Sequence, residues 1–249
     1  MSLPEKQFES DYYDENYFAV PKGKKFPGAD GKMQGWSYAN PEGEWTGCEP
    51  IVKAWKEMFN PVNMLDVGAG RGTFIAYARD VGIKAVGFDY SKWAVGSGRY
   101  KRCKPEWLKM QDATRYWPYK EKQFDLVVAL DFYEHIYETD LDHVKKEMFF
   151  TTKKWLFLQI AVAGSGGLQG ESKDGYSLKK GEPVPKGLEG VAVAGHVNVR
   201  PEQYWIDYLE HDEFMLRRDM KNFFCGLVSK PVIQNWLLNS ILIFERVTD

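Results

Sequence analysis

The chain has 249 residues, a formal net charge of −2 and three widely spaced cysteines. This length is sufficient for one α/β domain with a sizeable core. The charge argues against a nucleic-acid-binding protein, because gripping a phosphate backbone requires a basic face. The odd number of cysteines indicates neither a disulfide framework nor a zinc site.

Composition also bears on where the protein works. The polar, acidic N-terminus does not resemble a signal peptide, and free cysteines fit a reducing compartment. The longest apolar stretch, Trp155 to Gly164, is too short to span a bilayer. We therefore expect a cytoplasmic protein without a membrane span. The sequence does not indicate its oligomeric state.

Residues 1–49 are dense in aromatic side chains, which argues against a disordered tail. We expect this segment to form an aromatic N-terminal cap. Its side chains either pack against the edge of the domain or close over a ligand, and we expect a mixture of the two. The stretch from Tyr12 to Phe18 is the part expected to face the ligand, together with Trp36 and Trp45.

Residues 50–249 alternate between strand and helix patterns. Helices are expected from Pro50, from about Gly72, after Ser91, over 139–150 and from Pro201. Strands are expected over 62–67, 84–88, 106–110, 124–130, 155–163, 214–218 and 240–247. This alternation predicts a doubly wound α/β domain with a mainly parallel, seven-stranded sheet and helices on both faces.

Residues 164–195 interrupt this pattern with many glycines and two prolines. A long segment without regular structure is uncommon in a compact domain unless it is functional. It leaves the carboxyl end of the fifth strand, which is the edge where open α/β sheets bind ligands. We expect a lid-like insertion after strand five.

The most informative stretch runs from Met64 to Gly72 and places glycines at alternate positions after Asp66. It predicts a strand, a tight turn and the start of a helix, which together suit an anionic or nucleotide-like ligand. The dinucleotide fingerprint G-x-G-x-x-G does not fit, since the third glycine comes one position early. This spacing counts against a nicotinamide-dependent oxidoreductase.

The D-x-G-x-G-x-G form resembles the first motif of class I S-adenosylmethionine-dependent methyltransferases. Four further stretches resemble later parts of that family in the same order, at residues 85–89, 109–113, 124–130 and 131–136. The resemblance implies S-adenosylmethionine as the cofactor. It also implies a set of cofactor-binding residues, namely Asp66, Gly68, Ala69, Gly70, Gly72, Asp89, Tyr90, Asp112, Ala113 and Leu130.

Each of these positions has an expected task. The glycines let the backbone lie against the methionine and ribose portions, and Asp89 accepts hydrogen bonds from the ribose hydroxyls. Tyr90 lies against the adenine, while Asp112 and the Ala113 N–H bind its edge. Asp66 orients the amine end. Taken singly, each aspartate also fits a helix cap or a solvated strand end.

The acceptor side is less defined. Candidate catalytic residues are Tyr133, Glu134, His135 and His196, of which the two histidines are candidate general bases. Glu134 with His135 could also form part of a Mg²⁺ site, but no cluster of ligands indicates a tightly bound metal, so none is predicted.

The expected reaction is methyl transfer to an oxygen or nitrogen of a small molecule, such as a sugar, quinone, lipid or other metabolite, by in-line displacement. The prolines typical of base-amine methyltransferases are missing after strand four, which favours small molecules over nucleic acid. Methylation of RNA or protein remains an alternative, as does a non-catalytic cofactor-binding partner of an active subunit.

Overall fold

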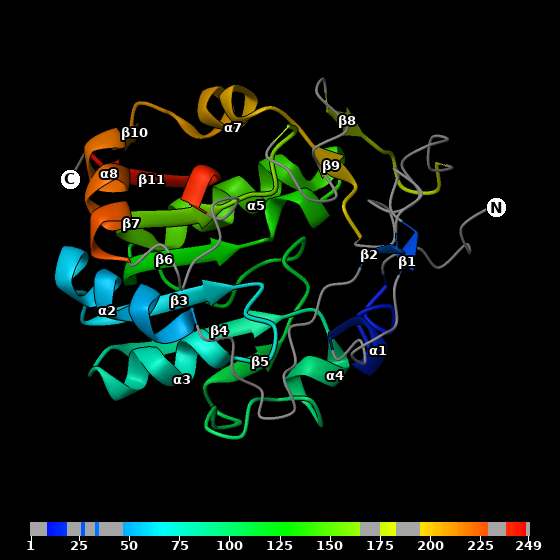
Figure 1. Cartoon of the computed structure of the whole chain (residues 1–249), viewed down its shortest axis with the longest axis horizontal. Coiled ribbons are helices and arrows are strands. Elements are labelled where there is room, and N and C mark those ends of the chain that lie inside the picture. Colours follow the sequence, from blue (N-terminus) through cyan, green and yellow to red (C-terminus); the bar gives the residue numbers. More distant parts are fainter. Residues whose placement is uncertain are drawn as a thin grey trace.

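A seven-stranded sheet with helices on both sides forms the body of the protein (Figure 1). The computed structural model describes residues 9–18, 26–27, 33–34, 47–164, 175–182, 195–228 and 238–247. The predicted residues Trp36 and Trp45, and most of the glycine-rich insertion, lie outside these ranges. No helix among the described residues is long and apolar enough to cross a bilayer.

The order of strands in the sheet is β10-β11-β7-β6-β3-β4-β5. The strands are β3 (Asn63–Val67), β4 (Lys84–Asp89), β5 (Leu108–Met110), β6 (Phe124–Leu130), β7 (Thr152–Gln159), β10 (Phe214–Leu216) and β11 (Ile241–Arg246). All neighbouring pairs from β7 to β5 are parallel, while β11 runs antiparallel to both β7 and β10. The predicted doubly wound, mainly parallel α/β sheet is confirmed.

Helices cover the two faces of the sheet and bury a separate core on each. Residues of α2, α3 and α8 pack with one face, and residues of α5 and α7 pack with the other. These helices are α2 (Cys48–Phe59), α3 (Thr73–Asp80), α5 (Glu138–Thr151), α7 (Glu202–Leu209) and α8 (Arg218–Leu227). Fully buried strands explain the nearly continuous apolar runs in the sequence, such as that of β6.

The smaller elements lie mostly at the carboxyl ends of the parallel strands. They are α1 (Glu15–Phe18), α4 (Lys92–Val95), the 3₁₀ turn η1 (Tyr133–His135), and two short antiparallel pairs, β1 (Phe26–Pro27) with β2 (Met33–Gln34) and β8 (Tyr176–Ser177) with β9 (Asn198–Val199). The second pair joins part of the glycine-rich insertion to the chain that follows it.

The fifth strand differs from its prediction at both ends, since β7 covers 152–159 rather than 155–163. Pairing with β11 stops at Gln159, which lies opposite Ile241. Beyond that point the backbone N–H of Ala161 donates to the Glu134 carboxylate, 3.1 Å away. The apolar run continues past the strand because Ile160, Ala161 and Val162 are buried outside the sheet.

Two helices also differ from expectation. The helix predicted from Pro50 begins at Cys48, after Gly47, because proline is tolerated throughout the first turn, where N–H groups have no intrahelical partner. Helix α8 was not predicted. It follows β10 directly and buries Phe224 against the core formed with α2 and α3.

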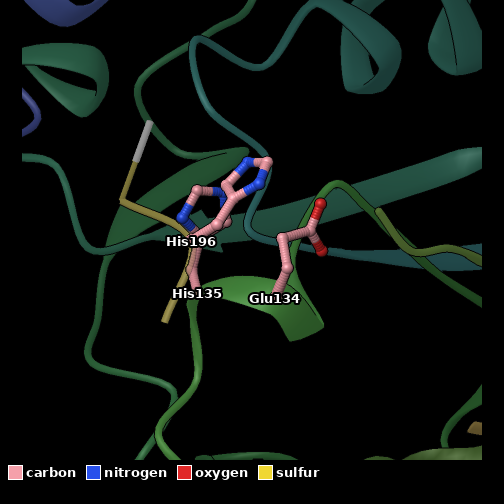
Figure 2. A group of neighbouring side chains, drawn as sticks. All are labelled: Glu134, His135 and His196. Atoms are coloured by element: carbon pink, nitrogen blue, oxygen red, sulfur yellow. The ribbon is translucent and has the colours of Figure 1, made fainter. Parts of the chain in front are cut away.

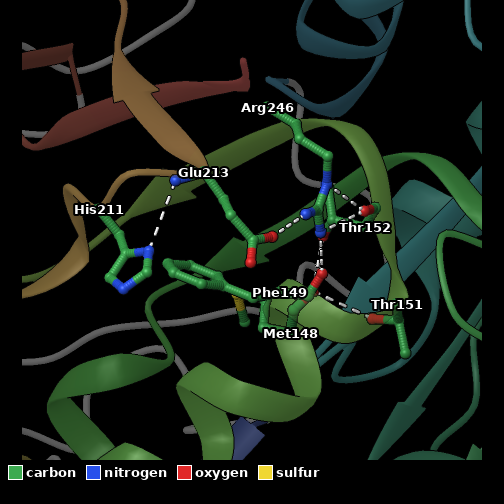
Figure 3. A network of polar contacts seen from close by, with 7 residues as sticks. All are labelled: Met148, Phe149, Thr151, Thr152, His211, Glu213 and Arg246. Carbon is green, nitrogen blue, oxygen red and sulfur yellow. Dashed lines mark hydrogen bonds and ion pairs between the residues drawn. The ribbon is translucent and has the colours of Figure 1, made fainter. Parts of the chain in front are cut away.

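Arg246, in the last strand, ties three parts of the fold together (Figure 3). Its guanidinium donates to the carbonyls of Thr152 and Phe149 at the end of α5 and pairs with the Glu213 carboxylate. The cation therefore satisfies carbonyls that have no partner within the helix, at the end where a positive charge is favourable. The contact holds the antiparallel edge of the sheet against α5.

Candidate active site

The turn between β3 and α3 is shaped by its three glycines, which have φ values of 70°, 52° and 77° at Gly68, Gly70 and Gly72. Other residues rarely adopt this left-handed region. Space is also limited, because a β-carbon at Gly68 would lie 2.7 Å from Phe132 Cδ2. The N–H of Ala69 donates to the carbonyl of Phe88 at 3.0 Å and holds the turn against β4.

Asp89, at the end of β4, is bonded to this turn. One carboxylate oxygen accepts from the Gly70 N–H and the other from the Ser91 N–H, each at 2.7 Å. Burial raises the pKa of Asp89, while these backbone donors act in the opposite direction. A carboxylate has about four lone-pair sites, so Asp89 retains acceptor capacity for a diol.

Asp66 lies beneath the turn and is almost fully buried. Its Oδ2 atom has no hydrogen-bond partner among the described residues. Burial, and then the charge of Asp89, raise the pKa of Asp66 well above its ordinary value. A buried acceptor without a partner is costly, so this oxygen is suited to receive a donor from a bound molecule or from water.

Tyr90 and the following turn contact the N-terminal segment. The Tyr90 hydroxyl donates to Glu9 Oε2 at 2.8 Å, and burial is the first of the causes that raise its pKa to about 12. The Ser91 hydroxyl caps α4 by accepting from the Ala94 N–H, and it also donates to the Tyr13 carbonyl. The N-terminal segment thus lies directly beside the predicted cofactor residues.

Asp112 and Ala113 follow β5. The Asp112 carboxylate accepts from both the N–H and the hydroxyl of Thr114, at 2.8 and 2.7 Å. This is a local turn cap, which is the structural alternative that its position in the sequence also allowed. Ala113 is buried, and its carbonyl accepts from the indole of Trp117 at 2.9 Å.

The end of β6 brings the acceptor candidates to the same edge as the glycine turn. Leu130 ends the strand, and Asp131 follows with a positive φ of 48°. Phe132 then lies against Gly68, as described above. Asp131 was not among the predicted site residues. Its backbone conformation, which is strained for a residue with a β-carbon, is common at functional turns.

Tyr133 lies away from this edge. Its side chain is fully buried, its hydroxyl contacts Met148 Sδ at 3.5 Å, and its ring packs against Trp205. It belongs to the core between the sheet, α5 and α7. The structure does not place it in contact with an acceptor.

Glu134, His135 and His196 converge (Figure 2). One potential ligand atom from each lies within 4.8 Å of the others, and the two imidazole centroids are 4.9 Å apart. His135 Nδ1 is 3.0 Å from the Gly195 carbonyl, and the Val197 N–H donates to the Glu134 carbonyl at 2.8 Å. The chain after the insertion therefore folds back onto η1 and brings His196 with it.

Burial controls the protonation of this cluster. It lowers the pKa of His135 to about 4 and that of His196 well below its ordinary value, so both imidazoles are neutral near pH 7. Burial likewise raises the pKa of Asp131 to about 6, and burial raises the pKa of Glu134 well above its ordinary value. The Asp131 and Glu134 carboxyls influence each other's pKa, and the charge of Asp131 raises that of Glu134.

The cluster corrects the expectation that the chain contains no grouping of metal-ligand residues. The sequence shows only the adjacent pair Glu134-His135. His196 lies 61 positions after His135, so no local spacing reveals the third member. The contact of Glu9 with Tyr90 was missed for the same reason, whereas Tyr13 belongs to the stretch that was expected to face the ligand. For Asp131, its spacing of three residues before Glu134 was an available signal.

The chain is similar to known methyltransferases in both sequence and fold. A family profile described as "Methyltransferase domain" matches residues 43–211. No curated protein sequence matches the chain. Among solved structures, the plantazolicin methyltransferase BpumL in complex with a pentazolic desmethylPZN analog and SAH has a TM-score of 0.53 at 14% identity, over 83% of this chain and 86% of that chain.

Two further structures illustrate the range of similarity. The plantazolicin methyltransferase BamL has a TM-score of 0.50 at 13% identity, over 82% of this chain and 84% of that chain. The PH0226 protein from Pyrococcus horikoshii OT3 has a TM-score of 0.43 at 20% identity, over 61% of this chain and 66% of that chain. The family match covers most of the chain, and the fold and glycine turn agree with it. The chain therefore belongs to the methyltransferase-domain family, as a class I S-adenosylmethionine-dependent methyltransferase.

Proposed function

We propose that the protein transfers the methyl group of S-adenosylmethionine to an oxygen or nitrogen atom of a small molecule, such as a sugar, quinone, lipid or other metabolite. One observation carries this proposal. The glycine turn and the Glu134–His135–His196 cluster share the carboxyl edge of the sheet, joined through the contact of Phe132 with Gly68. A methyl donor bound at the glycine turn would therefore lie next to an acceptor bound at the cluster.

In this proposal the cofactor occupies the edge formed by β3, β4 and β5. Its ribose hydroxyls bind Asp89, its amine end lies toward Asp66 Oδ2, and its adenine lies between Tyr90 and the turn at Asp112 and Ala113. Gly68, Ala69, Gly70, Gly72 and Leu130 form the surface beneath it. The acceptor atom attacks the methyl carbon opposite the sulfur, and the C–S bond breaks as the new bond forms. The sulfonium is already activated, so alignment and exclusion of water supply most of the rate.

His135 is suited to take a proton from an acceptor hydroxyl. Its Nδ1 faces the Gly195 carbonyl, so Nδ1 carries the hydrogen and Nε2 keeps its lone pair. Burial keeps this imidazole neutral near pH 7, so its lone pair is available, and the same burial makes the ring a weaker base than an exposed histidine. His196 is the second candidate. We also propose that the N-terminal segment and the described part of the insertion, residues 175–182, close the site from the outside.

The cofactor assignment is tested by Asp89→Ala. The variant leaves ribose hydroxyls and the Gly70 N–H without an acceptor, at a cost of about 1–3 kcal/mol. Calorimetric binding of S-adenosylhomocysteine is therefore expected to weaken about 10- to 100-fold. Asp80→Ala is the matched control, because Asp80 ends α3 in an exposed ion pair with Arg102. Equal affinity in both variants would remove Asp89 from the site.

The acceptor class is tested with S-adenosylmethionine labelled on its methyl group. Purified protein is incubated with a cell extract that is then separated into small molecules, RNA and protein. Label in the small-molecule fraction is expected, and desmethylPZN analogs, which BpumL binds in its crystal structures, can be added as defined acceptors. Label found only in RNA or only in protein would replace the proposed acceptor class. Cofactor binding without transfer to any fraction would favour the non-catalytic alternative.

A further inference from the structure

We propose that Glu134, His135 and His196 bind one divalent transition-metal ion, such as Zn²⁺, Co²⁺ or Mn²⁺, beside the predicted methyl-transfer position. The three side chains offer two imidazole nitrogens and a carboxylate oxygen within 4.8 Å of one another (Figure 2). Donors that share one ion at about 2.1 Å lie roughly 3–3.5 Å apart. The side chains therefore need to draw together by about 1–2 Å.

A second observation points to a ligand at this place. Glu134 is fully buried, and its Oε1 accepts from the Ala161 N–H. Its Oε2 has no hydrogen-bond partner among the described residues. Buried oxygens are nearly always satisfied, because an unsatisfied one costs about 1–3 kcal/mol. A cation between this oxygen and the imidazoles satisfies it.

Hydrogen bonds and ring contacts fix the orientation of the histidines, as they usually do for histidines that bind metals. The Nδ1 hydrogen of His135 is directed at the Gly195 carbonyl, 3.0 Å away, which fixes the tautomer and directs Nε2 elsewhere. The carbonyl of His196 accepts from the Tyr176 hydroxyl at 2.8 Å. Tyr13 packs edge-on against the His135 ring, with centroids 6.0 Å apart. These contacts limit the positions that both rings can take.

The donor types select the class of ion. Imidazole nitrogen favours zinc, iron, nickel and copper, whereas Mg²⁺ and Ca²⁺ prefer sets made of oxygen. Two histidines with one glutamate make a donor set known from catalytic zinc sites.

The role of the ion rests on the proposed function. When the ion is bound, His135 Nε2 is a ligand and no longer acts as the base. An acceptor hydroxyl bound to the ion becomes more acidic and loses its proton to water. The oxygen then forms a bond to the methyl carbon while the carbon–sulfur bond breaks and sulfur keeps the electron pair. The products are the methyl ether and neutral S-adenosylhomocysteine. The ion is neither oxidised nor reduced.

The test measures metal content and is independent of activity. The full chain is stripped with a chelator, equilibrated separately with Zn²⁺, Co²⁺, Mn²⁺ and Mg²⁺, and dialysed. Mass spectrometry is expected to find one transition ion per chain, and bound Co²⁺ is expected to show visible absorption. His196→Ala and Glu134→Gln are expected to lower the affinity at least 10- to 100-fold. His211→Ala, at an exposed histidine, is expected to bind as the wild type does.

Each other outcome overturns the proposal. It fails if the wild type retains no ion, if only Mg²⁺ binds, or if His196→Ala binds transition metal as tightly as His211→Ala does. Circular dichroism and binding of S-adenosylhomocysteine confirm that each variant is folded, and His196→Asn replaces any that is not. Metal binding without cofactor binding would contradict the proposed function alone, and cofactor binding without metal binding would contradict this inference alone.

Discussion

Gly72 shows how one backbone position shapes the cofactor turn. It precedes α3 with a φ of 77°, and a β-carbon there would lie 2.5 Å from Cys103 Sγ. Two separate costs therefore oppose any side chain at this position. One is the left-handed backbone, worth about 1–2 kcal/mol, and the other is overpacking, worth about 1–3 kcal/mol.

Gly72→Ala is expected to lower the free energy of unfolding by about 2–4 kcal/mol in urea titrations. Gly82→Ala is the control for the backbone cost alone. Gly82 has a φ of 83° and a β-carbon there would meet no atom within 4 Å, so this variant is expected to lower the free energy of unfolding by about 1–2 kcal/mol. Adding Cys103→Ala to Gly72→Ala is expected to recover part of the loss. Equal losses in the two glycine variants would show that Cys103 adjusts without cost.

Individual site residues were predictable where the relevant contacts are local. Gly68 and Gly70 are predicted by their spacing to form a tight turn, which their positive φ values confirm, and Asp89 ends its strand as predicted and is bonded to that turn. The sequence predicted His135 and His196 as candidate bases on the acceptor side, but not their direct contact, which depends on how the chain returns after the insertion. The burial of Tyr133 was not predictable either, because adjacent residues of a 3₁₀ turn point in different directions and this one points into the core.

At the scale of elements, Asp125 joins the start of β6 to the start of β3. Its carboxylate accepts from the N–H groups of Val62 and Asn63, at 2.9 and 3.3 Å, and from Lys153 at 3.1 Å. The Asn63 side chain returns a bond by accepting from the Asp125 N–H at 2.8 Å. Burial alone would raise the pKa of Asp125, but these donors hold it below its ordinary value.

Asp125→Asn is expected to reduce stability by about 1–2 kcal/mol at pH 7, because the charge-assisted bonds are lost. A carboxyl whose pKa is lower in the folded state contributes stability above its unfolded pKa of about 3.9. That contribution disappears as the pH falls through the folded pKa. Urea titrations at pH 7 and at pH 3 should therefore show a clear difference between wild type and variant that becomes smaller in acid. A difference that persists in acid would assign the effect to shape rather than charge.

The ends of a helix or strand were predictable where they coincide with the ends of an apolar run in the sequence. The prediction for β6 matches the structure at both ends, where the apolar run and the strand coincide. For β7 the two do not coincide, because the strand ends opposite Ile241, where its partner β11 begins, while burial continues. Helix α8, between the last two strands, was not predicted.

At the scale of the whole molecule, residues 9–18 connect the two halves of the candidate site. Phe18 stacks on Trp93 in α4, with ring centroids 5.6 Å apart, beside the predicted cofactor edge. Tyr13 contacts the ring of His135, and Tyr12 and Tyr13 pack with the small cluster around Leu178 and Val197. A segment far from the site in sequence therefore contacts both the cofactor side and the acceptor side.

This arrangement predicts that the N-terminal segment and cofactor binding stabilise each other. Phe18→Ala and Tyr13→Ala remove contacts that hold the segment in place. Each is expected to weaken S-adenosylhomocysteine binding about tenfold, which corresponds to about 1.4 kcal/mol. Tyr116→Ala, at a tyrosine that is 71% exposed, is the matched control and is expected to bind as the wild type does. If the segment strengthens cofactor binding, cofactor binding must stabilise the segment by the same free energy. Saturating S-adenosylhomocysteine should therefore slow hydrogen exchange across residues 9–18 in the wild type. Unchanged exchange, together with unchanged affinity in both variants, would mean that the segment packs on the domain without taking part in cofactor binding.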